Sequence, residues 1–180
     1  MLYQRGFKVN RKFKYMMLIV PISVFLDQIT KHWAKSLRLE PPIKVIDNFF
    51  NLIYVENKGA AWGIGSKIPD DYRVLVFAAI SVLALGMIGY FFSKIKEDET
   101  MLIISLNFIF GGAIGNFIDR MAYSSVIDFI DWHYYDAHWP TFNIADVFIS
   151  IGVGILLLEM IFGKSELSLF AAQEDNKSEE

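Results

Sequence analysis

Carboxylate side chains gather around two apolar stretches between residues 111 and 146 of this 180-residue chain. The five of them are Asp119, Asp128, Asp131, Asp136 and Asp146. A charge at the centre of a membrane helix costs about 2.5–3.5 kcal/mol on insertion scales, so such carboxylates indicate a functional or bundle-facing role. Two carboxylates held close together cannot both ionise easily, and the pair can act as general acid and general base on water. This chemistry needs neither a metal ion nor a covalent intermediate.

Apolar segments of membrane length must position these side chains. The chain is 54% hydrophobic and 16% aromatic, with a mean hydropathy of +0.36, which is too apolar for a soluble domain of this size. Residues 74–92 give the clearest span, because they contain no charge and correspond to roughly 28 Å of helix. The pattern predicts four membrane helices, over about 15–37, 74–92, 101–120 and 142–162.

The connection over about 38–72 has the residue pattern of short strands. Pro41 and Pro42 end the first helix, and runs of Val, Ile, Phe and Tyr interrupted by Asn and Asp follow. We expect a small sheet on the membrane surface, with Trp62 at the level of the lipid headgroups. Residues 121–141 are expected to form an outer loop anchored by its Trp and Tyr side chains. The predicted fold class is an all-α membrane protein with four transmembrane helices and a small extramembrane β platform between the first and second.

Basic residues set the expected orientation. Residues 1–14 form a basic lead-in, the turn after the second helix carries Lys94 and Lys96, and residues 121–141 contain no Lys or Arg. Because short cytoplasmic loops are enriched in Lys and Arg, both termini are expected in the cytoplasm and residues 121–141 outside. A polar, acidic tail over 163–180 follows the last helix and is expected to be cytoplasmic as well.

Polar residues from three of the predicted helices fall at the same depth, because helices that alternate in direction bring their outer ends together. They are Asp27 and Lys31 from the first helix, Asn116, Asp119 and Arg120 from the third, and Asn143 and Asp146 from the fourth. A functional site would explain this convergence. Structural pairing would also explain it, because Asp27 and Lys31 have the i,i+4 spacing of a helical ion pair and Asn side chains commonly join membrane helices. The residues alone leave both interpretations open.

Other chemistries have weaker support. The chain has no cysteine, which excludes disulfides, thiolate catalysis and cysteine-based zinc sites. A Ser–Lys hydrolase could combine Ser124 or Ser125 with Lys58 or Lys31, and a metal site could use His133, Asp136 and His138, but no motif such as HExxH supports either. A proton- or ion-coupled carrier would also use membrane carboxylates. We expect no cofactor and no metal, and the lack of a basic stripe argues against nucleic acid as a partner.

Five short motifs appear along the chain in a fixed order: Asp27–Lys31, Asn57–Trp62, Gly115–Arg120, Val126–Phe129 and Phe142–Asp146. Their order and spacing resemble those of bacterial lipoprotein signal peptidase, or signal peptidase II, a family of intramembrane aspartyl proteases with four helices. The resemblance covers nearly all of residues 15–162. Each motif is short, and it is the ordered set of five that makes the resemblance specific.

The resemblance implies that Asp128 and Asp146 form the catalytic dyad. The residues alone do not separate Asp128 from the neighbouring carboxylates, and Asp119 is the next candidate because it shares a helical face with Asn116. The polar residues that the resemblance places around the dyad as substrate-binding or supporting groups are Asp27, Lys31, Asn57, Gly59, Asn116, Asp119, Arg120 and Asn143. Within this set, Asp119 and Arg120 are expected to form a charge pair, and the two helical Asn side chains to orient the substrate or the dyad.

The resemblance also implies the partners. The substrate would be a prolipoprotein that already carries diacylglycerol on a Cys, with cleavage just before that Cys. Membrane lipid and inhibitors of the globomycin type would be the other ligands, and the protein would act as a monomer in the bacterial inner membrane, with its site near the outer face. The aromatic segment 131–140 departs from a minimal member of the family, and it is expected to be an interfacial anchor rather than a substrate contact.

Overall fold

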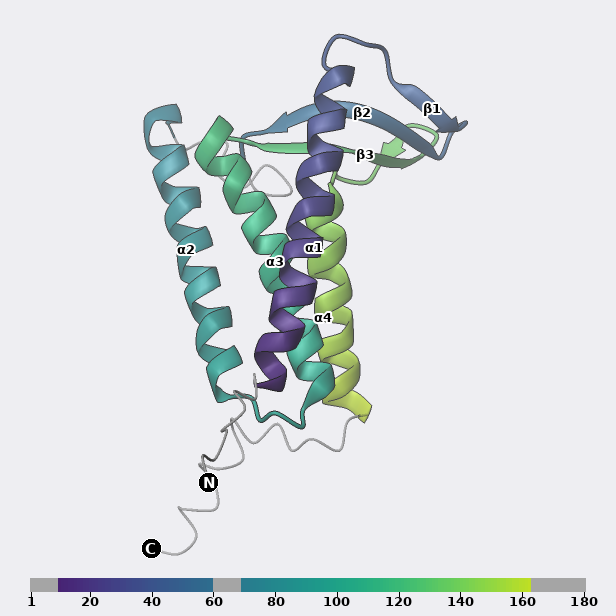
Figure 1. Cartoon of the computed structure of the whole chain (residues 1–180). Helices are drawn as coiled ribbons and strands as arrows, with labels where there is room; N and C mark the ends of the chain where they lie inside the picture. Colours follow the sequence, from purple (N-terminus) through teal and green to yellow (C-terminus); the bar gives the residue numbers. More distant parts are fainter. Residues whose placement is uncertain (1–9, 60–68, 163–180) are drawn as a thin grey trace, which may run out of the picture.

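The computed structural model describes residues 10–59 and 69–162, in which the chain forms four long helices and a small antiparallel sheet (Figure 1). The helices are α1 (Arg11–Ala34), α2 (Asp70–Lys94), α3 (Thr100–Tyr123) and α4 (Ile144–Phe162), and the short 3-10 helix η1 (Lys35–Leu37) follows α1. The strands are β1 (Ile43–Ile46), β2 (Phe50–Asn57), β3 (Val126–Tyr134) and β4 (Ala137–His138). All four long helices are long and apolar enough to cross a membrane. The predicted fold class is confirmed.

The first helix begins earlier than the sequence predicted. The side-chain oxygen of Asn10 accepts a hydrogen bond from the Lys12 backbone N–H at 2.9 Å, which caps the helix at Arg11. Lys12 therefore belongs to α1 rather than to the lead-in, and its ammonium donates to the Ile95 carbonyl oxygen just after α2, at 2.6 Å. The expectations for Trp62 and for the tail over 163–180 lie outside the described residues.

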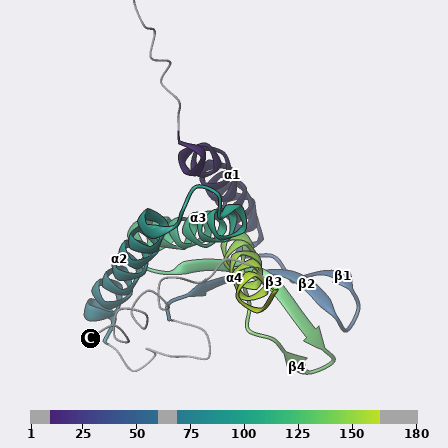
Figure 2. The same cartoon turned by 90° about the horizontal axis from the view of Figure 1, so that it is seen from below.

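Helix α3 packs against each of the other three helices and lies at the centre of the bundle (Figure 2). Glycines on this helix permit the close approach. A Cβ atom at Gly112 would meet the Ala145 carbonyl oxygen of α4, and one at Gly115 would meet the Asp27 carboxylate of α1. Backbones in membrane bundles approach closely where such small residues lie at the interface. The glycines therefore bring the polar residues of α1 and α4 against α3.

The sheet lies across one end of the bundle and is built from both connections at that end (Figure 1). Strands β1 and β2 lie between α1 and α2, whereas β3 and β4 lie between α3 and α4. Residues 121–141 were expected to be a loop, but they contain the strands β3 and β4. Residues 126–131 of β3 are buried throughout, because this part of the strand pairs with β2 on one side and Ile130 pairs with Phe142 on the other. Six consecutive buried residues are typical of a central strand.

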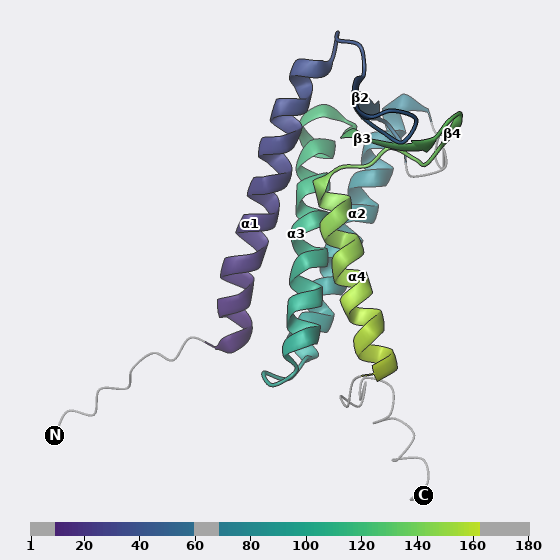
Figure 3. The same cartoon turned by 90° about the vertical axis from the view of Figure 1, so that its right-hand side faces the viewer.

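After the β3–β4 hairpin, the chain runs back beside β3 and then enters α4. Ile130 and Phe142 exchange two backbone hydrogen bonds, at 2.9 and 3.1 Å. This bridge places the first turn of α4 beside Asp128, and the sheet stands on the α4 side of the bundle rather than over α1 (Figure 3). Below the sheet, Ala34, Ile127 and Phe129 form a buried apolar cluster that fixes β3 to the end of α1. The fold thus brings together β3, the C-terminal end of α1 and the N-terminal end of α4.

Candidate active site

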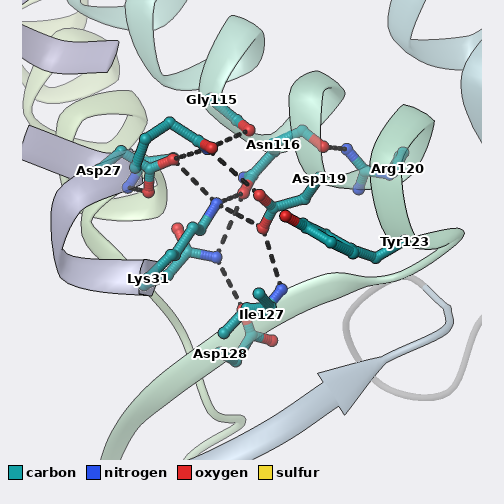
Figure 4. Close-up of polar contacts among 12 residues, drawn as sticks. Asp27, Lys31, Gly115, Asn116, Asp119, Arg120, Tyr123, Ile127 and Asp128 are labelled. Carbon is teal, nitrogen blue, oxygen red and sulfur yellow. Dashed lines mark hydrogen bonds and ion pairs between the residues drawn. The ribbon is translucent and has the colours of Figure 1, made fainter. Parts of the chain in front are cut away.

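A buried ammonium forms the centre of the polar layer between α1 and α3 (Figure 4). The Lys31 ammonium lies 2.9 Å from Asp27 Oδ2 and 3.0 Å from Asp119 Oδ2, and the lysine side chain is 1% exposed. The i,i+4 ion pair expected between Asp27 and Lys31 is therefore present. The expected charge pair between Asp119 and Arg120 is wrong. Successive residues point about 100° apart on a helix, so Asp119 faces α1 while Arg120 turns away from it.

Neutral groups complete the coordination of these two carboxylates. Asp27 Oδ1 accepts the Ala145 backbone N–H at 2.9 Å, and Asp119 Oδ2 accepts the Ile127 backbone N–H at 3.0 Å. The Gln28 side-chain amide lies between the two carboxylates and donates to both, at 3.1 Å each. Each carboxylate therefore joins its own helix to a different element of the chain. Gln28 was not among the predicted residues, although its place next to Asp27 could have indicated it.

The Asn116 side chain connects this charged cluster to Asp146. Its oxygen accepts a hydrogen bond from the Lys31 ammonium at 2.9 Å, and its Nδ2 donates to Asp146 Oδ1 at 2.8 Å. Asn143 Nδ2 also donates to the Asn116 oxygen, at 3.2 Å. The amide is thus bonded on both sides, with an ammonium at its oxygen and a carboxylate at its nitrogen.

Asp146 and Asn143 cap helix α4 reciprocally. The Asn143 side-chain oxygen accepts the Asp146 backbone N–H, and Asp146 Oδ2 accepts the Asn143 backbone N–H, both at 3.1 Å. This is the capping-box arrangement, in which the residue before the helix and the third helical residue satisfy each other's backbone. The first turn of a helix also stabilises a negative charge, because its free N–H groups and its dipole point toward it. Asp146 is therefore held in one position by its own helix end.

Asp128 lies on β3 and receives two amide donors. Asn57 Nδ2 from β2 donates to Oδ2 at 2.9 Å, and Asn143 Nδ2 donates to Oδ1 at 2.7 Å. Asn57 is itself held by the Gly59 backbone N–H, which donates to its side-chain oxygen at 3.0 Å. Burial raises the pKa of the Asp128 carboxyl to about 7, and the nearby Asp146 charge adds to the rise, while the two amide donors and the Lys31 charge oppose it. Asp128 is thus set to exchange a proton near neutral pH.

A cavity of about 580 Å³ opens beside Asp128 and Asp146. These two are the only carboxylates among its lining residues in the described part of the chain. Four of the predicted supporting residues also line it, namely Asn57, Gly59, Asn116 and Arg120. Asp27, Lys31 and Asp119 do not line it and lie in the closed cluster behind. Asn143 lies between the two sets and bonds to both Asp128 and Asn116.

The far wall of the cavity is apolar and was not predicted. It is formed by the end of the β3–β4 hairpin and one face of α4, with Trp132, Trp139, Val147 and Ile151 among the lining residues. The aromatic segment 131–140 was expected to anchor the protein at the interface, yet two of its Trp side chains face this space. The available signals were the alternation along β3, and the i,i+4 spacings of Asp146 with Ser150 and of Val147 with Ile151 on α4.

The remaining candidates take other places. Asp131 is buried on the sheet, where Asn51 donates to it at 3.0 Å and His138 lies 2.7 Å away. The His133 and His138 rings stack on each other with their centroids 4.8 Å apart. The three N–H groups of Lys31 bind Asp27, Asp119 and Asn116, so this lysine cannot serve as a base for a serine.

The family follows from a comparison of the sequence with known proteins. The model of the signal peptidase (SPase) II family matches residues 19–162, which contain every polar group of the layer described above. The chain belongs to this family. Curated signal peptidase II sequences agree with the match. The lipoprotein signal peptidase of Syntrophotalea carbinolica is 40% identical over 148 residues, covering 82% of this chain and 91% of the relative.

Further relatives and solved structures cover the same region. The lipoprotein signal peptidase of Geobacter sulfurreducens is 42% identical over 141 residues, covering 77% of this chain and 86% of that protein. One solved structure described as a bacterial membrane enzyme is 32% identical with a TM-score of 0.71, covering 84% of this chain and 90% of the other. A second, described in the same words, is 34% identical with a TM-score of 0.70, covering 82% and 92%. The resemblance found from the five motifs is confirmed, and the fold is that of known membrane enzymes.

Proposed function

We propose that this member of the signal peptidase II family is an aspartic endopeptidase that removes signal peptides from lipid-modified prolipoproteins, with Asp128 and Asp146 as its dyad. The observation that carries the proposal is the lining of the cavity. Among the described residues, only these two carboxylates face it, and neutral amides from three elements hold both. The other buried carboxylates of the polar layer are bound to an ammonium and face away from the cavity.

The roles of the two carboxyls differ. Asp128, whose pKa is raised to about 7 by burial, holds the shared proton and donates a hydrogen bond to the carbonyl oxygen of the scissile peptide. Asp146, which accepts a hydrogen bond from the Asn116 side-chain amide, takes a proton from the attacking water as the water oxygen bonds to the peptide carbon. Asp146 then passes this proton to the leaving amine as the C–N bond breaks, so Asp128 keeps its own proton and the pair returns to its starting state. Neither step needs a metal ion or a covalent intermediate.

The shape of the cavity supports the proposed substrate class. One end is polar, with Asn57, Asn116 and Arg120 at the carboxylates, and the other end is apolar. A diacylglyceryl-modified Cys next to the scissile bond has the same division between a polar backbone and lipid chains. The cleavage would fall just before that Cys, at the sheet end of the bundle, and the sheet would stand on the outer face of the inner membrane with both termini inside. The protein would act as a monomer, and a globomycin-type peptide would compete for the same space.

A cleavage assay tests the proposal. Purified protein in detergent is given a synthetic prolipoprotein precursor with or without diacylglycerol on its Cys, and the products are separated by gel electrophoresis and identified by mass spectrometry. We expect cleavage only of the lipidated precursor, immediately before the modified Cys, and inhibition by globomycin. Proton flux in liposomes without any cleavage would instead support a carrier and would reject the proposal.

A further inference from the structure

The Asn116 amide lies between opposite charges, and this fixes its orientation. Its oxygen faces the Lys31 ammonium at 2.9 Å, and its nitrogen faces Asp146 Oδ1 at 2.8 Å. A half-turn of the amide would place its N–H groups against the ammonium and its oxygen against the carboxylate. Both contacts would then be repulsive, because a Lys ammonium can only donate and a carboxylate can only accept. The described arrangement is the one that satisfies both neighbours.

The Lys31 ammonium is itself fixed on every side. Its three donors are used by Asp27 Oδ2, Asp119 Oδ2 and Asn116 Oδ1, all within 3.0 Å, and the residue is 1% exposed. Asp27 is held in turn by the backbone of α4, and Asp119 by the backbone of β3 (Figure 4). The two carboxylates of Asp27 and Asp119 already carry more negative charge than is needed to neutralise the one ammonium. The third N–H of the ammonium donates to the neutral Asn116 amide, and this hydrogen bond is not needed to neutralise the charge.

We propose that Lys31 is a positioning residue for Asp146, and that its ammonium orients the Asn116 amide so that an N–H always faces the Asp146 carboxylate. The inference rests on the proposed function in that Asp146 is taken as a member of the dyad. Asn143 continues the same polarity, since its side-chain oxygen is held by the Asp146 backbone N–H and its Nδ2 donates to Asp128. The direction of donation therefore runs from the buried ammonium through Asn116 to Asp146, whereas the Asp146 backbone N–H orients the Asn143 amide that donates to Asp128. Asp27 and Asp119 serve to hold the lysine.

The test separates this role from a purely structural one. A single Lys31→Met change would leave Asp27 and Asp119 as unpaired buried charges, so it is made together with Asp27→Asn and Asp119→Asn. This Met triple variant has no buried charge in the cluster and no donor for the Asn116 oxygen at position 31. A matched triple variant carries Lys31→Gln instead, whose neutral amide can donate to that oxygen. The two variants differ in the presence of this donor.

We expect the Met triple variant to keep the melting temperature of the parent within about 5 °C and to lose at least thirtyfold in kcat on the lipidated precursor, with KM changed less than threefold. The Gln triple variant should recover at least threefold of that kcat. A Met variant as active as the parent, or Met and Gln variants of equal kcat, would overturn the proposal. Such a result would mean that Lys31 contributes only to stability.

A spectroscopic measurement does not depend on activity. Protein labelled with ¹⁵N at Asn side chains is observed by NMR in detergent, and the Asn116 signal is assigned by its loss in Asn116→Ala. In the unmodified chain, we expect one Asn116 side-chain NH₂ pair, slow to exchange with deuterium. Two exchanging orientations, or rapid exchange with solvent, would overturn the inference. Because this measurement does not depend on cleavage, a failed cleavage assay rejects the proposed function without deciding the role of Lys31.

Discussion

Two pairs of carboxylates lie within one polar layer of this molecule and have different partners. Asp27 and Asp119 share a buried ammonium and are closed off between α1 and α3. Asp128 and Asp146 accept hydrogen bonds from Asn side-chain amides, Asp146 also accepts the Asn143 backbone N–H, and both face a cavity. All four are Asp residues near the ends of membrane helices, so the residue type alone does not separate them. Their partners do.

The difference in partners shows how one polar layer can both hold helices together and contain a reactive site. Two carboxylates that share one buried ammonium form a closed ion cluster, and loss of the ammonium would leave buried carboxylates unpaired, which is strongly unfavourable. A carboxyl bound by neutral amides keeps acceptor oxygens in either protonation state. The first pair is therefore suited to hold helices together, and the second to exchange protons with a substrate. The predictions below test this division.

The largest effect is expected from neutralising either member of the second pair. Asp128→Asn and Asp146→Asn should each lower kcat for the lipidated precursor by about a thousandfold, the middle of the usual range for a lost acid or base. Both variants should remain folded with a modestly lower melting temperature, because Asn has nearly the shape of Asp but only one acceptor oxygen for the two hydrogen bonds that each carboxylate accepts. Circular dichroism melts and the cleavage assay measure the two quantities on the same samples.

The matched control for these variants is Asp131→Asn on the same strand. Asp131 is also buried, but its partners are Asn51 and His138, and it does not line the cavity. We expect this variant to keep its activity within about threefold. A fully active Asp128→Asn variant, or an inactive but folded Asp131→Asn variant, would show that the wrong carboxylate of β3 has been assigned.

A change that disturbs the packing around the first pair, Asp27 and Asp119, should lower the stability of the protein. In Gly115→Ala, the new methyl group would meet the Asp27 carboxylate directly, so the joint between α1 and α3 must open. Overpacking of this kind costs about 1–3 kcal/mol, and we expect a clearly lower melting temperature. Gly154→Ala on α4 is the control, because nothing lies within 4 Å of its new Cβ and alanine favours a helix. Equal melting temperatures for the two variants would contradict the close packing at Gly115.

The second pair should also respond to pH. Burial raises the pKa of Asp128 to about 7, so the protonated form that the mechanism uses is present below this pH and is lost above it. Activity should therefore fall about tenfold per pH unit on the alkaline side of about 7. Asn57→Leu removes a donor that favours the ionised form, so the same fall should begin at a higher pH, whatever the loss in rate. A profile that stays flat to pH 9 would assign the shared proton elsewhere.

The smallest expected effect concerns the connection between the two pairs, where α3 ends and β3 begins. Ser124 has a φ of +58°, in the left-handed region that favours glycine, and its backbone N–H closes the last turn of α3. Ser124→Gly should raise stability by about 0.5–1 kcal/mol. The neighbouring Ser125→Gly should lower it, because Ser125 has no such conformation and donates to the Tyr123 carbonyl oxygen at 3.3 Å. Melting temperatures of the two variants give the comparison directly.

The sequence could predict the features that depend on local spacing. Four apolar segments predicted the four helices, and the i,i+4 spacing predicted the contact between Asp27 and Lys31. The convergence of polar residues at one end followed from alternating helix directions alone. The choice of Asp128 came only from the family resemblance, and it remains a prediction, although the cavity lining supports it.

The features that depend on pairing between distant segments were missed. The strand β3 was taken for a loop, since its aromatic residues are also typical of a membrane interface and its partner β2 lies some 70 positions earlier. Asp119 was paired with its neighbour Arg120, because the helical rotation between adjacent residues was given too little weight. The capping box of Asn143 and Asp146 could have been found, since the two residues have its three-residue spacing just before an apolar run.

The joining of two separate connections between helices in one sheet has a consequence for how the protein is made. Chains emerge from the ribosome with the N-terminus first, and β2 must wait for β3, which is synthesised after two more membrane helices. Asp128 then still lacks Asn143 and Asp146, which arrive only with α4. A nascent chain therefore has no competent site while its own helices are being inserted. Under the proposed function, the order of synthesis alone would delay proteolysis until the last helix is in place, without any inhibitory segment.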